Sequence, residues 1–163
     1  MRTLILISAA VFSLTIAEAQ VVVQNQESRM VPRSIYGLGL AAGFASGFGL
    51  SFRHHLPGFF SYQIIAGVIK VDKETDYNVG GEFQFDIMRG DISRFFADVA
   101  MGYFYSGDKG RNKLDGPYRE GIGFGWEWMT VGPMNFTTEL LFTNFSDGTI
   151  LPLPQVSAHY YFF

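Results

Sequence analysis

Seven ionisable side chains stand out because each lies at an alternate position within an otherwise apolar stretch. Successive side chains of a β-strand point to opposite faces, so this spacing places them on the polar faces of strands. We expect one polar network inside the fold, with Arg53 paired to acids, His159 level with Glu139, and some acids protonated or sharing a proton with His159. The network comprises Arg53, Glu82, Asp86, Asp98, Glu127, Glu139 and His159. The alternative is a set of independent, hydrated groups.

Other patterns that could carry chemistry are weaker. His54 and His55 are adjacent, so in a strand they point to opposite faces and cannot chelate one ion. Ser157 and His159 would share a face roughly 7 Å apart, too far for direct proton transfer. With no cysteine in the chain, disulfides, thiolate metal sites and cysteine nucleophiles are excluded. We therefore predict no catalytic residues, no cofactor and no metal site.

The composition of the 163-residue chain points to an apolar surrounding. Hydrophobic residues make up 48%, aromatic residues 17% and charged residues only 17%, whereas an average soluble domain carries about 25% charged residues. The net charge of −3 offers no basic excess for a nucleic-acid partner. The abundant apolar area also excludes intrinsic disorder.

The N-terminus has the pattern of an export signal. Arg2 precedes the apolar stretch 4–16, and Ala17-Glu18-Ala19 matches a small-x-small cleavage site. We predict a cleaved signal peptide at 1–19 and a polar linker at 20–34. The alternatives are a buried N-terminal helix or a retained anchor. Beyond the signal the longest apolar run, 64–69, has six residues, too few for a transmembrane helix.

From residue 35 onward, period-2 alternation broken by Gly, Pro and Asp predicts eight strands. Each is about 9–12 residues long, the length of a tilted transmembrane strand. The register of 59–71 stays open, because that stretch is apolar on both faces. The expected strands are 35–44, 47–55, 59–71, 77–88, 95–106, 121–130, 135–144 and 155–163.

The expected connections alternate in length. Segments 55–58, 89–93 and 131–134 are short turns, whereas 72–76, 107–120 and 145–154 are longer and more polar. A tight first turn near Ala45-Ser46 joins the longer set. Short turns on one side and longer loops on the other are typical of outer-membrane barrels. The polar network would then occupy the half of the barrel nearer the short turns.

The polar strand faces carry glycine and a few acids, whereas a water-exposed face would carry many Lys and Glu residues. Aromatic side chains recur near strand ends, as they do in the interfacial girdles of membrane barrels. Residues 35–163 are therefore expected to form an all-β, eight-stranded antiparallel up-and-down transmembrane β-barrel. Its apolar face would meet lipid.

The chain resembles the small eight-stranded outer-membrane β-barrel proteins of Gram-negative bacteria, through its signal peptide, its length and its terminal Phe163. The resemblance implies a monomer in the bacterial outer membrane, in contact with lipid and lipopolysaccharide. It also implies a C-terminal signal for the barrel-assembly machinery, to which Tyr161 and Phe163 would belong. The alternate apolar set Val156, Ala158, Tyr160 and Phe162 leaves the register of the last strand open by one residue.

An eight-stranded barrel has room inside only for its own side chains. We therefore expect a structural or surface-interaction protein, neither a pore nor an enzyme. One alternative is a lipid A-modifying enzyme, since the resembling proteins include a deacylase with a Ser-His-Glu arrangement, although its His-x-Ser-Asn motif is absent here. The other is a soluble lipocalin-like barrel that binds an apolar ligand.

Overall fold

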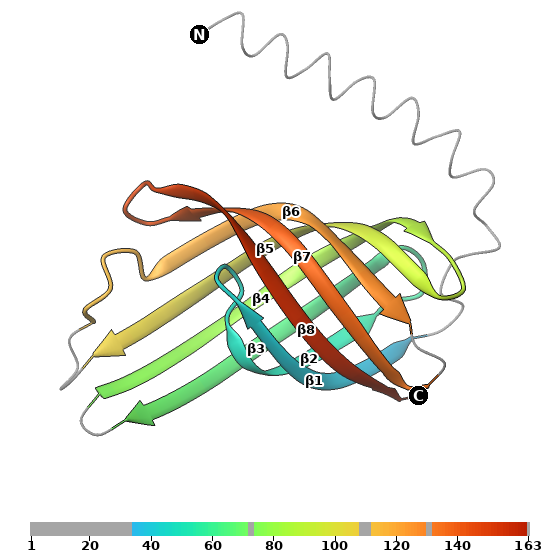
Figure 1. Ribbon diagram of the computed structural model, residues 1–163, viewed down its shortest axis with the longest axis horizontal. Helices are drawn as coiled ribbons and strands as arrows, with labels where there is room; N and C mark the ends of the chain where they lie inside the picture. Colours follow the sequence, from blue (N-terminus) through green and yellow to red (C-terminus); the bar gives the residue numbers. More distant parts are fainter. Residues whose placement is uncertain (1–33, 72–73, 108–111, 130–131, 163) are drawn as a thin grey trace, which may run out of the picture. The chain divides into compact units, whose positions relative to one another are not determined.

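A computed structural model describes residues 34–71, 74–107, 112–129 and 132–162. Each strand pairs antiparallel with the next, and β8 pairs with β1, so the sheet closes into a barrel (Figure 1). The prediction of an all-β, eight-stranded up-and-down barrel is confirmed. The strands are β1 (Ile35–Gly43), β2 (Phe48–His55), β3 (Phe60–Val71), β4 (Glu74–Arg89), β5 (Ser93–Gly107), β6 (Tyr118–Met129), β7 (Met134–Phe145) and β8 (Ile150–Phe162).

The expected signal peptide at 1–19 and nearly all of the expected linker at 20–34 lie outside the described residues, as does Phe163. Among the described residues, no helix has the length and apolar character needed to cross a membrane.

Side-chain alternation is clearest in β7, where every second residue points into the lumen. Asn135, Thr137 and Glu139 are buried inside, whereas Phe136 and Leu140 are exposed on the outer face. The period-2 pattern of the sequence therefore corresponds to the two faces of the barrel wall.

The two strands whose register was open are now placed. In β3, Ser61, Gln63 and Ile65 point inward, so the more polar set of that stretch faces the lumen. In β8, the buried His159 faces the lumen, and Tyr161 contacts lumen groups. The apolar set that contains Val156, Tyr160 and Phe162 is on the outer face.

β8 begins at Ile150, five residues before the expected start at 155, and it includes Pro152 and Pro154. A proline cannot donate a ladder hydrogen bond, which argues against a central strand. The structure explains the exception, because β1 ends at Gly43 opposite Gln155. The first residues of β8, from Ile150 to Pro154, pair only with β7. The two prolines therefore lie where the other edge of β8 has no neighbouring strand.

Regular side-chain alternation is interrupted in β4, where the pairing with β5 skips Ile87 and passes from Asp86–Phe96 to Met88–Phe95. Such a bulge inserts one extra residue and re-aims the side chains that follow. Beyond it Met88 is exposed and Arg89 reaches back to Asp86.

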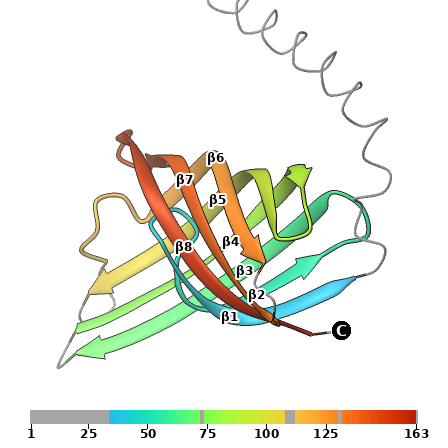
Figure 2. The ribbon, with the colours of Figure 1, turned by 45° about the vertical axis from the view of Figure 1, so that its right-hand side comes forward.

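The β1–β2 hairpin is short, and β3 to β6 extend well beyond its turn (Figures 1 and 2). Instead of standing at the rim, the turn 44–47 folds into the lumen, where Ala45 and Ser46 are fully buried. Gly80 and Gly102 make this possible. A Cβ atom at Gly80 would collide with the Ser46 carbonyl oxygen, and one at Gly102 with that of Ala45. We call the end with the β2–β3, β4–β5 and β6–β7 connections the short-turn end, and the opposite end the loop end.

Candidate functional site

The lumen of the barrel is polar, which is the reverse of a water-soluble domain. Among the described residues, nineteen polar or charged side chains are buried, against seven hydrophobic ones. The small apolar cluster of Ala45, Ala100 and Leu141 lies beside the β1–β2 turn. The polar groups therefore form the main core, and their mutual contacts determine what the interior can do.

Arg53 of β2 reaches into the middle of the lumen and is fully buried. Its Nη1 donates to Thr137 at 2.7 Å and to Glu127 at 3.3 Å. Its Nη2 donates to the Ser157 hydroxyl at 3.1 Å and lies 3.6 Å from Glu139, while Nε donates to Gln63 at 2.7 Å. A guanidinium, with five donors in a fixed fork, can bridge four strands in this way.

Arg94 of β5 is a second buried arginine that the sequence analysis did not include in the network. It donates to Asp86 at 2.7 Å, to Gln84 at 2.6 Å and to the Ser61 hydroxyl at 3.0 Å, and it forms an ion pair with Glu127. The signal was available, since Arg94 has the same parity as Asp98 in a stretch that alternates. Arg94 was missed because it falls between the predicted turn at 89–93 and the predicted strand at 95–106.

Glu127 of β6 accepts hydrogen bonds from both arginines and from the Tyr161 hydroxyl at 2.8 Å. Tyr161 is also hydrogen-bonded to His55 Nε2 at 2.8 Å. This group lies toward the short-turn end, and Arg89 adds an ion pair to Asp86 there. Tyr161, expected as part of an assembly signal, is therefore a lumen residue.

Glu82 and Glu139 occupy the next level, beneath the β1–β2 turn. The Gln155 amide donates to both carboxylates at 2.9 Å, and the Gln84 amide donates to them at 3.1 and 3.3 Å. Asp98 has a ligand atom within 4.8 Å of both glutamates. The structure thus brings together Arg53, Glu82, Asp86, Asp98, Glu127 and Glu139, the six expected residues other than His159.

The expected place of His159 is wrong. The β7–β8 register sets Glu139 opposite Gln155 and places His159 opposite Asn135, four residues away. The His159 ring is hydrogen-bonded to the Ser51 hydroxyl at 2.8 Å, and its Nδ1 has no partner among the described residues. Gln155 occupies the position that we expected for His159, and its amide donates to Glu139.

The remaining candidate groups are serines and histidines of β2 and β8. Ser51, rather than Ser157, contacts His159, and both members of that pair are fully buried. His54 stacks on Tyr36 on the outer face with ring centroids 4.4 Å apart, whereas His55 is buried in the lumen. The two adjacent histidines therefore point to opposite sides of the sheet, as strand geometry requires.

Arg119 covers the lumen on the loop side of the β1–β2 turn. It donates to the Phe44 carbonyl at 3.0 Å and stacks on the rings of Phe104 and Phe145, 3.9 and 4.9 Å from their centroids. Below it, the Gln155 side-chain oxygen accepts hydrogen bonds from Ala45 and Ser46. These contacts fasten the turn inside the barrel.

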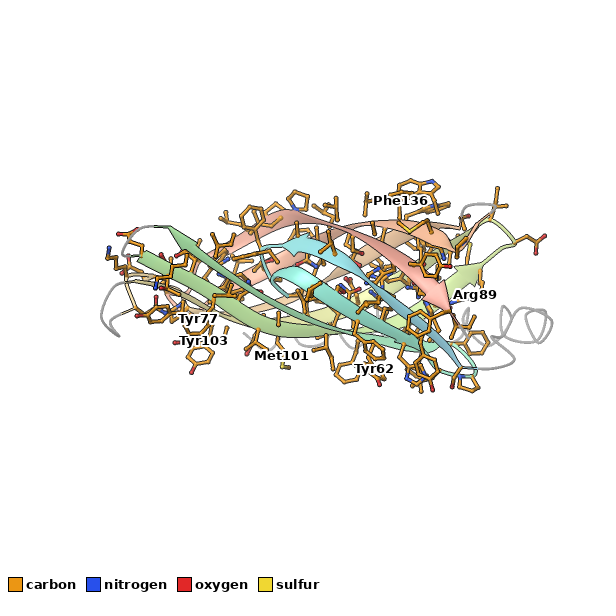
Figure 3. The ribbon with its side chains drawn as sticks, turned by 90° about the horizontal axis from the view of Figure 1, so that it is seen from below. Tyr62, Tyr77, Arg89, Met101, Tyr103 and Phe136 are labelled. Atoms are coloured by element: carbon orange, nitrogen blue, oxygen red, sulfur yellow. The ribbon has the colours of Figure 1, made fainter. Side chains whose placement is uncertain are left out.

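The outer face carries large apolar side chains over its whole height. Four tyrosines lie near the loop end. The rings of Tyr77 and Tyr105 stack with their centroids 4.7 Å apart, and the ring centroids of Tyr103 and Tyr118 are 4.9 Å apart. Figure 3 shows Tyr62, Tyr77, Met101 and Tyr103 pointing away from the barrel wall, with Tyr77 and Tyr103 toward the opposite end from Arg89.

No known family model matches the chain, and no curated protein is significantly similar to it.

Proposed function

We propose that the protein is an integral outer-membrane β-barrel with a side-chain-filled lumen, acting as a structural or surface-interaction protein rather than a pore. The observation that carries the proposal is the inverted distribution of side chains. Thirty-two large hydrophobic residues are exposed among the described residues, while buried arginines and acids fill the interior.

The exposed apolar surface supports the proposal that lipid surrounds the barrel. A water-soluble monomer rarely exposes a contiguous apolar patch larger than a few hundred Å², yet here exposed apolar side chains occur on all eight strands. Leaving such a surface in water costs about 25 cal/mol per Å². A bilayer removes that cost, and the closure of β8 on β1 pairs the backbone over the length that these two strands share.

The positions of the aromatic side chains support the proposal that the barrel crosses two membrane interfaces. Tyr77, Tyr103 and Tyr118 lie at the loop end, and Trp126 and Trp128 lie toward the short-turn end of β6. Tyr and Trp favour the boundary between acyl chains and headgroups, where the ring is apolar and its polar atom is hydrated. Tyr118 and Trp128 are ten residues apart on β6, about 33 Å along a strand, and a tilt of about 40° reduces this to about 25 Å, the height of the apolar band of a membrane barrel.

The packed lumen supports a role other than transport. The β1–β2 turn and the stacked Arg119 cover it toward the loop end, and the network around Arg53 and Arg94 fills it below. What remains for interaction is the loop end, where Lys113 and Glu74 form an exposed ion pair. We propose that these loops contact lipopolysaccharide or an external partner, and that the barrel is a monomer inserted by the assembly machinery.

Fractionation of expressing cells, followed by gel electrophoresis, tests the proposal. The expected result is recovery in the outer membrane, extraction only with detergent, and a folded band that shifts in mobility when the sample is boiled. A detergent-free monomer in the soluble fraction would support the lipocalin-like alternative instead. Altered lipid A masses in cells that express the protein would indicate the enzyme.

A further inference from the structure

Three carboxylates converge at one level of the lumen. Glu82 comes from β4, Asp98 from β5 and Glu139 from β7, and each offers an oxygen within 4.8 Å of the other two. Their side chains are enclosed, with exposed fractions of 1%, 2% and 7%. Like charges this close repel strongly where water is excluded.

Asp98 is the residue that the protein itself leaves unsatisfied. Neither of its carboxylate oxygens has a hydrogen-bond partner among the described residues, although both are buried and one is directed at the two glutamates. A buried carboxylate is normally paired, hydrogen-bonded or bound to a metal ion. Asp98 therefore lacks a partner that its surroundings require.

The arginines of the lumen do not supply this partner. Arg94 and Arg89 pair with Asp86, and Glu127 takes both Arg94 and Arg53. Glu139 lies 3.6 Å from Arg53. Within the described residues, no arginine or lysine forms an ion pair with Glu82 or Asp98. These two buried carboxylates thus lack an ion-pair partner among the described residues.

The two glutamine amides orient the glutamates without neutralising them. Gln84 and Gln155 each donate from their NH₂ group to both Glu82 and Glu139. Their side-chain oxygens are turned away, toward Arg94 and the β1–β2 turn respectively. The glutamates are held in place, and Asp98 closes the third side of the group.

We propose that Glu82, Asp98 and Glu139 bind one divalent cation, and that the ion is Ca²⁺. Ca²⁺ takes oxygen ligands at 2.3–2.6 Å, so oxygens separated by up to about 5 Å can contact the same ion. The shorter bonds and strict octahedral geometry of Mg²⁺ suit this spacing less well. The ion would tie β4 and β5 to β7 across the lumen. This inference is independent of the proposed function, since it concerns only the interior.

The test uses the full mature chain refolded in detergent, either with CaCl₂ or with EDTA, because an enclosed site is best loaded during folding. After desalting, bound calcium is counted by elemental mass spectrometry, and the unfolding temperature is measured by circular dichroism. We expect one Ca²⁺ per chain and an unfolding temperature roughly 5 °C or more above that of the EDTA sample. No retained calcium and equal unfolding temperatures would overturn the proposal.

Variants identify the ligands. Asp98→Asn should abolish calcium retention, and in EDTA it should unfold no earlier than the unchanged protein, because it removes repulsion. The matched control is Asp86→Asn, at a lumen acid that is paired with arginines, which should still retain one Ca²⁺ per chain. Glu82→Gln gives a second test if Asp98→Asn does not fold. Retention of calcium by both Asp98→Asn and Glu82→Gln would overturn the proposed site.

Discussion

Glu127 links the two buried arginines in the short-turn half of the lumen. It accepts hydrogen bonds from Arg53, Arg94 and Tyr161. Three donors offset the cost of burying this carboxylate. Removing one of its partners leaves a charge with too few hydrogen bonds in a low-dielectric interior. The stability of the network therefore depends on keeping opposite charges matched.

Arg53→Met should reduce the free energy of unfolding by roughly 3–5 kcal/mol, because Glu139 then loses its arginine and Glu127 keeps only Arg94. Urea unfolding of the refolded barrel, in a buffer free of divalent cations, measures the loss. Adding Glu139→Gln should recover part of it. An Arg53→Met barrel with unchanged stability would show that the lumen groups act independently and are hydrated.

Tyr161→Phe should cost about 1–3 kcal/mol, because Glu127 and His55 both lose a buried hydrogen-bond partner. The neighbouring Tyr160→Phe is the control, since Tyr160 lies on the outer face. Urea midpoints of the two variants give the comparison. Equal effects would place both side chains in the same surroundings and contradict the inward position of Tyr161.

For single residues, the sequence predicted well which side chains face the lumen. It predicted less well at what height along the barrel each of them lies. Alternation placed Glu82, Asp98 and Glu127 on the lumen side without any long-range information. It did not fix how far one strand slides against the next, so Gln155, rather than His159, lies opposite Glu139. Relative height depends on barrel tilt and on bulges such as the one at Ile87.

The β1–β2 hairpin is the element that distinguishes this barrel from a simple cylinder. Its turn, 44–47, enters the lumen and is held by Gln155, while Asn78 accepts a hydrogen bond from the backbone N–H of Phe48, directly after the turn. Sequence analysis predicted a tight turn near Ala45-Ser46 but not its depth. That depth depends on Gly80 and Gly102, which come from strands far along the chain. The early start of β8 at Ile150 was missed for a related reason, since only the shortness of β1 allows its two prolines.

Gly80→Ala should destabilise the barrel by about 1–3 kcal/mol, because the added methyl group would overlap the Ser46 carbonyl oxygen and displace the turn. Gly132→Ala is the matched control, as no atom lies within 4 Å of a Cβ built there. Urea unfolding gives both values. If Gly80→Ala is as stable as Gly132→Ala, the turn does not lie in the lumen.

The outer face of β7 offers a test of its surroundings. If Leu140 faces the middle of a bilayer, Leu140→Arg should cost about 2–4 kcal/mol of folding free energy in lipid vesicles. Ile92→Arg, in the exposed β4–β5 connection, should be nearly neutral. A neutral Leu140→Arg would mean that this face contacts water.

At the scale of the whole molecule, the barrel is a polar interior inside an apolar shell. The predicted fold class followed from composition and period alone, because few charged residues and alternating strands leave few other architectures. The alternation that predicted the wall makes no prediction for the loops, since loop chemistry varies independently of the wall that supports it.

The fluorescence of the two tryptophans tests the central claim of an inverted barrel most directly. Trp126 and Trp128 are the only tryptophans in the chain and both are exposed on the outer face of β6. The barrel is refolded into vesicles of lipids brominated at different depths. We expect blue-shifted emission, quenched by every brominated lipid and most strongly by bromines near the headgroups. A barrel that folds in plain buffer, with emission unaffected by any brominated lipid, would contradict the account.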